Sequence, residues 1–173
     1  MEAIVDMKTA VFKIVDGDAG AYKNPDAVEN VIRYIFRESA RRKDNIWGSV
    51  GTFNKSIEGV IEDFQKMKRL HHKEDGVQIK HMILSFGERP DLPKKKIKKL
   101  LLQTIIFWGK DYQMVYAVHE DKGLDKYHVH IALNSVSNDG KKVSIRNKDL
   151  KNFRKNFNRI WNKYGYEMTM ERT

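Results

Sequence analysis

Three histidines and a trailing asparagine stand at spacings that could build a metal centre. His128 and His130 are separated by one residue and Asn134 follows, so the three side chains share one face of a strand. His119 ends another strand-like run, and the polar, Gly-containing stretch before His128 predicts a hairpin connection. Closing that hairpin brings three imidazoles together. Neutral imidazoles with open coordination positions suit a catalytic divalent metal, and ligand type alone allows Mg²⁺, Mn²⁺ or Zn²⁺.

Two polar residues could support these imidazoles without binding the metal themselves. Asp121, two residues after His119, could orient an imidazole ring, or it could simply belong to the turn. Asn134 could hold a ligand or phosphate oxygen through its amide, or it could cap the end of its strand. His71 and His72 are adjacent on a predicted helix and therefore point in different directions. We interpret this pair as solvated, without a catalytic role.

A metal that polarises a phosphate still needs an attacking group. The chain has no cysteine, so the candidates are water, serine and tyrosine. Tyr34 lies beside the apolar stripe of a predicted helix, which places its hydroxyl at the helix edge. Spacing alone favours a simpler interpretation, a tyrosine at the boundary of core and solvent. Basic residues that would suit a phosphodiester surround it, namely Arg33, Arg37, Arg41, Arg42 and Lys43.

The pattern of elements predicts an α+β fold that could position these groups. We expect strands over residues 9–15 and 77–86, hairpin strands around His119 and His128, and strands over 141–145 and 166–170. Helices are expected over residues 25–39, 57–67, 91–108 and 150–164, and a loop over 40–54. This mixed order implies a central, largely antiparallel sheet with helices packed mainly on one face. The other face would be open to carry the site.

Length and composition bound the class of protein. The 173 residues, 40% of them hydrophobic, form a single domain over residues 1–173. The absence of cysteine excludes disulfides and zinc thiolates. No apolar run is long enough to span a bilayer, so we expect no membrane insertion and a cytoplasmic location. The net charge of +10 favours polyanionic partners, nucleic acid first. The densest lysine cluster is interpreted as the solvated face of a helix; it comprises Lys94, Lys95, Lys96, Lys98 and Lys99.

Three motifs, in order, resemble one family over about residues 10–170. The segment from His119 through His128 and His130 to Asn134 is similar to the metal-binding motif of the relaxase domain of conjugative and mobilisation nucleases, the MOB-P class of the HUH endonuclease superfamily. The run Val31–Ile35 resembles that family's nucleophile helix. The strand His81–Phe86, with Ser85, resembles the segment that contacts DNA near the nick.

The resemblance implies an HUH relaxase-like fold and a specific chemistry. Tyr34 would attack one strand of single-stranded or extruded origin-of-transfer DNA, leaving a 5′-phosphotyrosyl link that the released 3′-hydroxyl can later reseal. His119, His128 and His130 would bind Mg²⁺ or Mn²⁺, with Asp121 and Asn134 behind them. Ser85 would contact DNA, and the basic loop would supply further contacts through Arg41, Arg42, Lys43 and Trp47.

The resemblance also implies a context. Such domains act in the bacterial cytoplasm with accessory mobilisation or coupling proteins, and they usually form the N-terminal domain of a longer protein. Two alternatives stay open. A rolling-circle replication initiator would carry its nucleophile after the histidines, where Tyr164 and Tyr166 lie. A non-catalytic, basic single-stranded DNA-binding module would use the histidines only for packing.

Overall fold

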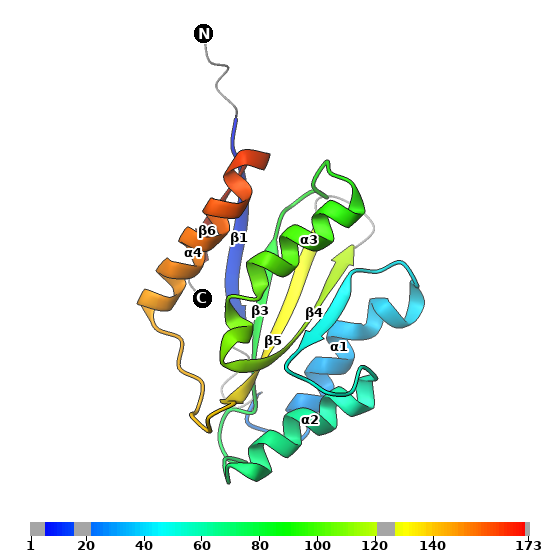
Figure 1. Ribbon diagram of the computed structural model, residues 1–173, viewed down its shortest axis with the longest axis vertical. Helices are drawn as coiled ribbons and strands as arrows, with labels where there is room; N and C mark the ends of the chain where they lie inside the picture. The colour runs from blue at the N-terminus through cyan, green and yellow to red at the C-terminus, as the bar shows by residue number, and fades with distance from the viewer. Residues whose placement is uncertain (1–5, 16–21, 121–126, 172–173) are drawn as a thin grey trace.

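A six-stranded sheet forms the centre of the molecule (Figure 1). The computed structural model describes residues 6–15, 22–120 and 127–171, and the side chains of residues 38–41 are not described. The strand order is β2-β4-β5-β3-β1-β6, and every neighbouring pair is antiparallel except β1 and β6. The strands are β1 Lys8–Val15, β2 Trp47–Val50, β3 Ile79–Ser85, β4 Tyr112–Glu120, β5 Tyr127–Ser137 and β6 Tyr166–Met170.

Within the described residues, four helices accompany the sheet: α1 Ala27–Arg41, α2 Ile57–Leu70, α3 Lys94–Ile105 and α4 Asn147–Trp161. Short 3₁₀ turns follow α3 and α4, at η1 Trp108–Lys110 and η2 Asn162–Tyr164. Ser56 caps the N-terminus of α2, because its side chain accepts a hydrogen bond from the Gly59 N–H at 3.0 Å. Gly165, with φ of 83°, ends η2 in the left-handed conformation that glycine tolerates.

The helices divide between the two faces of the sheet. Val129, Ile131 and Leu133 of β5 face one core, which contains buried residues of α3 and α4. Ala132 faces a second core, formed with α1 and α2. The α+β class and the largely antiparallel sheet are therefore confirmed, whereas the helices do not lie mainly on one face. The physical reason is that β4 is buried along residues 113–119, and a strand apolar on both faces must be covered on both.

The face that carries α1 and α2 is covered over only part of its width. These two helices contact β3, β4 and β5. Further along the same face, Lys13 of β1 and Ile83 and Ser85 of β3 keep partial exposure. The sheet face expected to be open is thus half covered, and the exposed part begins beside β5.

Two predicted elements differ from the structure. The expected loop over residues 40–54 contains β2, which pairs with β4; its four residues include Gly48 and are too short to show a strand pattern. The expected strand over residues 141–145 is reduced to an isolated bridge between Val136 and Lys142. Soon after that bridge α4 starts, where the Arg146 N–H donates to the Asp149 carboxylate at 2.8 Å. The terminal strand is confirmed as β6.

None of the four described helices is both long enough and apolar enough to cross a membrane.

Candidate functional site

The β4–β5 hairpin brings the three predicted histidines onto one sheet face. His119 is the register partner of His128, and His130 lies between Ala117 of β4 and Ile83 of β3. The ring centroids of His119 and His130 are 4.1 Å apart, and those of His128 and His130 are 6.2 Å apart. The strand periodicity that placed His128 and His130 together therefore holds in the structure.

A fourth histidine joins this group from β3. The Nε2 atom of His81 lies 3.0 Å from Nδ1 of His130, and its Nδ1 atom lies 3.4 Å from the Tyr22 hydroxyl. Burial lowers the pKa of His81 to about 4, with His119 adding to the effect. Burial, followed by the neighbouring histidines, lowers the pKa of His130 to about 2. Both rings are therefore neutral near pH 7, the form in which imidazole binds metals.

His119 is held by the helix that crosses above it. Its Nε2 atom lies 2.8 Å from the main-chain carbonyl oxygen of Ile35 in α1. A carbonyl oxygen only accepts hydrogen bonds, so this nitrogen carries the hydrogen and the ring lone pair is on Nδ1. The contact fixes both the tautomer and the direction of the ring.

Tyr34 stands over the centre of the histidine group. Its ring centroid lies 5.3 Å from that of His130, 5.5 Å from that of His119 and 6.1 Å from that of His81. The guanidinium carbon of Arg37, one helical turn further along α1, lies 4.5 Å from the same centroid. With 41% of its surface exposed, Tyr34 remains open to a ligand. The predicted position at the helix edge thus faces the histidines.

The chemistry of this group suits a divalent metal, although its side chains are not arranged as a ready cage. Among the described residues, no three His, Asp or Glu side chains are grouped as metal ligands. Nδ1 of His130 faces His81, and Nε2 of His119 faces Ile35. The nitrogen of His130 turned away from His81 is Nε2, and that of His119 turned away from α1 is Nδ1. Neutral imidazoles of this kind can bind a divalent first-row metal and are most typical as ligands of Zn²⁺.

Asn134 belongs to a buried polar network further along the same face. Its Nδ2 donates to the carbonyl oxygen of Phe64 at 3.0 Å and to Oε1 of Gln113 at 2.8 Å, while its Oδ1 accepts from Nζ of Lys68. The side chain is fully buried, and these contacts join α2 to β4 and β5. The amide is thus engaged by protein groups. Asp121 lies outside the described residues.

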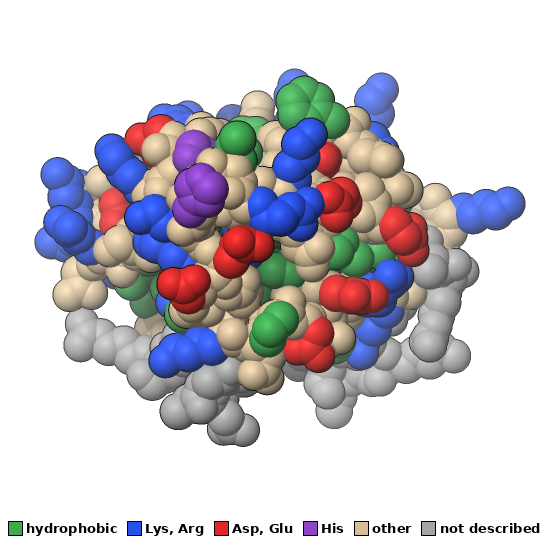
Figure 2. Space-filling view, turned by 90° about the horizontal axis from the view of Figure 1, so that it is seen from below, with side chains coloured by type: hydrophobic (Ala, Val, Ile, Leu, Met, Phe, Trp, Pro, Cys, Tyr) green, Lys and Arg blue, Asp and Glu red, His purple; other side chains and the backbone are tan. Residues whose placement is uncertain are grey.

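His71 and His72 end α2, away from this group. His71 packs so closely on Gly140 that a Cβ there would lie 2.5 Å from its Nδ1. His72 is exposed and adopts a φ of 53°. Histidine side chains are visible among lysines and arginines at the end of the molecule seen in Figure 2.

The residues expected to contact DNA lie near the end of the β4–β5 hairpin that carries His119 and His128. Ser85 is half-buried and is the register partner of His128. Trp47 begins β2, is 39% exposed and packs edge-on against Phe36 at 5.5 Å. Lys43 is exposed in the connection after α1. The side chain of Arg41 lies outside the described part of the chain.

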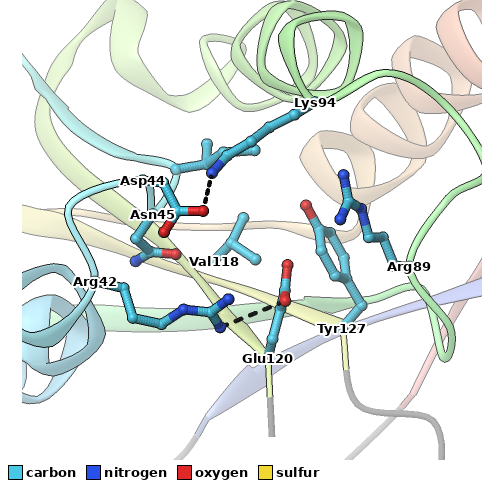
Figure 3. A pocket seen from close by; sticks show the side chains of 9 residues that line it. Arg42, Asp44, Asn45, Arg89, Lys94, Val118, Glu120 and Tyr127 are labelled. Carbon is cyan, nitrogen blue, oxygen red and sulfur yellow. Dashed lines mark hydrogen bonds and ion pairs between the residues drawn. The ribbon is translucent and has the colours of Figure 1, made fainter.

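Arg42 points into a small hollow on the opposite face of the hairpin (Figure 3). Its guanidinium lies 3.5 Å from the Glu120 carboxylate, and Lys94 pairs with Asp44 across the hollow at 3.0 Å. The hollow has a volume of about 60 Å³ and also borders Tyr127. Arg42 is therefore near the end of the hairpin but is separated from Tyr34 by the sheet.

The two later tyrosines do not approach the histidines. Tyr166 is buried against Phe86 and Trp161, with ring centroids 5.4 Å and 5.8 Å away. Tyr164 lies in η2 beside Lys96 and Lys163, which lower the pKa of its phenol. Both belong to the side of the sheet that carries α3 and α4.

Comparisons with known proteins identify one family. The family described as relaxase, MobA/VirD2-like, nuclease domain, matches residues 34–166. That match begins at the tyrosine over the histidines and includes all three hairpin histidines. The chain is also 33% identical over 135 residues to the protein rlx of Staphylococcus aureus, an alignment that covers 78% of this chain and 39% of that protein. The chain thus spans well under half the length of this relative.

Proposed function

Because the chain belongs to the family of MobA/VirD2-like relaxase nuclease domains, we propose that it nicks one DNA strand at an origin of transfer, for conjugative transfer or mobilisation. The observation that carries this proposal is the position of Tyr34, whose ring lies over His119, His130 and His81. A tyrosine over buried neutral imidazoles is suited to attack a phosphodiester whose charge is offset there.

Tyr34 is the proposed nucleophile. Its phenolic oxygen forms a bond to phosphorus and loses its proton, while the bond from phosphorus to the 3′-oxygen breaks and that oxygen takes up a proton. The product is a 5′-phosphotyrosyl link with a free 3′-hydroxyl. Arg37, stacked on the phenol ring, would place positive charge beside the negative phosphate.

His119, His128 and His130 are the proposed ligands of a divalent metal, Mg²⁺ or Mn²⁺. When bound, the metal would offset negative charge on the scissile phosphate. His81 would orient His130 through their shared hydrogen bond, and the Ile35 carbonyl would orient His119. Asp121 stays a candidate for the same supporting role.

The substrate would be single-stranded or extruded DNA, because a phosphate inside a duplex could not reach the buried histidines. The half-open sheet face beside β5 offers an approach, and Ser85 lies on it next to His128. Trp47, with Phe53 at 96% exposure, would stack on bases. Arg41 and Lys43 would contact phosphates near the site, whereas Arg42, paired with Glu120 on the other face of the hairpin, would contact DNA only there. Accessory mobilisation or coupling proteins would act with the protein.

The test is formation of a covalent protein–DNA adduct on single-stranded oligonucleotides that tile the DNA beside the gene, with Mn²⁺ or Mg²⁺. The wild type and Tyr164→Phe are expected to form the adduct, while Tyr34→Phe and chelator-treated wild type are not. An adduct that persists in Tyr34→Phe contradicts the assignment and favours a rolling-circle initiator. No adduct under any condition, with DNA binding unaffected by chelator, favours a binding module.

A further inference from the structure

The positive charge of the molecule is concentrated in two helices. α3 and α4 together carry ten of the 33 Lys and Arg residues and one of the 23 Asp and Glu residues, a net charge of +9 out of +10. The other 146 residues carry 23 basic and 22 acidic side chains and are nearly neutral. We call the ten basic side chains the α3–α4 basic surface: Lys94, Lys95, Lys96, Lys98, Lys99, Lys148, Lys151, Arg154, Lys155 and Arg159.

These cations are exposed and are not compensated by acidic neighbours. All ten are solvent-exposed. Within residues 6–15, 22–120 and 127–171, Lys94 is the one of the ten that forms an ion pair, with Asp44. The other helical layer differs, because Arg33 of α1 pairs with Glu29 and Glu58. At the end of the molecule where α2 lies, acidic and basic side chains are intermixed (Figure 2). Uncompensated repulsion on one surface destabilises a fold unless a polyanion offsets it.

The two helices present their cations together. They lie side by side in front of the sheet (Figure 1) and are joined by the Trp161 indole N–H, which donates to the Thr104 hydroxyl at 2.8 Å. At 1.5 Å per residue, α3 and α4 are roughly 18 and 22 Å long. Duplex DNA carries one charge per roughly 1.7 Å of its axis, so a duplex segment of this length carries on the order of ten phosphates on its two strands together. The charge on the two helices is comparable.

We propose that the α3–α4 basic surface binds double-stranded DNA that flanks the single strand entering the site on the other side of the sheet. The inference rests on the proposed nicking function. A single strand needs rings on which its bases can stack. Those of α4, Phe153, Phe157 and Trp161, are all buried, and α3 has none. The exposed rings Trp47 and Phe53 belong to the other layer.

The test is binding of a duplex of about 30 base pairs, of arbitrary sequence, over a range of salt concentrations. The Tyr34→Phe protein is used, so that cleavage plays no part. One variant replaces four lysines of the surface with glutamine: Lys95, Lys98, Lys151 and Lys155. The matched control replaces four exposed lysines elsewhere with glutamine: Lys23, Lys55, Lys66 and Lys73.

The surface variant is expected to bind the duplex at least about tenfold more weakly, with a log–log salt slope shallower by about three to four. The control should change affinity by less than about twofold. Equal weakening of both variants overturns the proposal. So does competition by polyglutamate as strong as that by duplex DNA, which would indicate an acidic protein partner. The same four substitutions are also made in the protein that keeps Tyr34, where loss of duplex binding with intact adduct formation is distinct from failure of the nicking function.

Discussion

The two helical layers differ in the side chains that they carry. The α1–α2 layer carries the proposed nucleophile, and the α3–α4 layer carries most of the net positive charge. The α1–α2 layer carries Tyr34 and covers the histidines, and its ionic side chains largely pair with one another. The α3–α4 layer carries nearly all of the net charge, and its buried side chains belong to the core on the other face of the sheet. The basic composition predicts nucleic acid as a partner but does not locate the proposed reacting groups. Those were located by residue type and spacing.

The layers also differ in how they are attached to the sheet. α4 is held by aromatic packing, with Phe153 at 4.7 Å from Phe12 and 5.0 Å from Trp108 between ring centroids. α2 adds a buried polar bridge, from Lys68 to Asn134 of β5. The aromatic packing of α4 stabilises the fold without involving a titratable group. The buried contact between Lys68 and Asn134 makes the stability of the α1–α2 layer sensitive to pH.

The largest stability effect is expected in the α3–α4 layer. Phe153→Ala should lower the free energy of unfolding by about 3–5 kcal/mol, because it leaves a cavity in a fully buried aromatic cluster. Urea denaturation measures it. The Mn²⁺ affinity of the remaining folded protein should not change, and Phe53→Ala, at an exposed ring, should leave stability nearly unaltered. A loss of metal affinity in Phe153→Ala would show that the layers are coupled.

Metal binding should depend on the histidines beneath Tyr34 and not on the α3–α4 layer. His130→Ala is expected to weaken Mn²⁺ binding by more than about 100-fold, and His81→Ala by roughly 10–100-fold, because His81 orients His130 from behind. Calorimetric titration with Mn²⁺ measures both without any need for cleavage. His72→Ala, at an exposed position, is the matched control. Wild-type affinity in His130→Ala would remove the metal site from this face.

The pH dependence of stability should identify the buried bridge. Burial lowers the pKa of Lys68 to about 7, and the positive charge of Lys142 adds to the effect. Between pH 7 and 10 the unfolded chain holds a proton that the folded chain has lost, so stability rises with pH by on the order of 1 kcal/mol per pH unit. Lys68→Met should remove that rise.

Denaturation at several pH values between 7 and 10 tests this, with Lys66→Met, exposed on the same helix, as control. The account of Lys68 fails when both variants keep the wild-type slope.

The smallest effect concerns how the helices begin. Ser56→Ala should cost about 1 kcal/mol, because the side chain caps the N-terminus of α2, whereas Ser56→Asp should keep most of the stability. α3 begins at Pro93 without a side-chain cap, so Pro93→Ala should not lose a comparable hydrogen bond. Thermal unfolding compares the three variants. An equal loss at both helices would remove this difference between the layers.

The sequence was sufficient for the parts of the site that are local. His128 and His130 share a face because strand side chains alternate, and His119 joins them through a hairpin whose turn residues are recognisable. Tyr34 could be placed at a helix edge, but not over the histidines, because helix-to-sheet packing depends on distant residues. The α+β class followed from the order of elements, whereas the division of helices between both faces did not.

The parts that could not be predicted depend on pairing between distant segments. His81 is 49 residues from His130 in the chain, and its contact arises because β3 lies beside β5. A lone histidine at the start of a strand carries no local signal of that neighbour. The parallel pairing of β1 with β6 and the four-residue β2 also depend on long-range contacts.

The assignment of Tyr34 as nucleophile is tested most directly by mass-spectrometric mapping of the peptide that carries DNA after reaction with single-stranded substrate. One phosphotyrosyl peptide is expected, containing Tyr34 of α1. A modified peptide containing Tyr164 or Tyr166 would contradict it, because the reacting group would then belong to the layer that we assign to duplex binding.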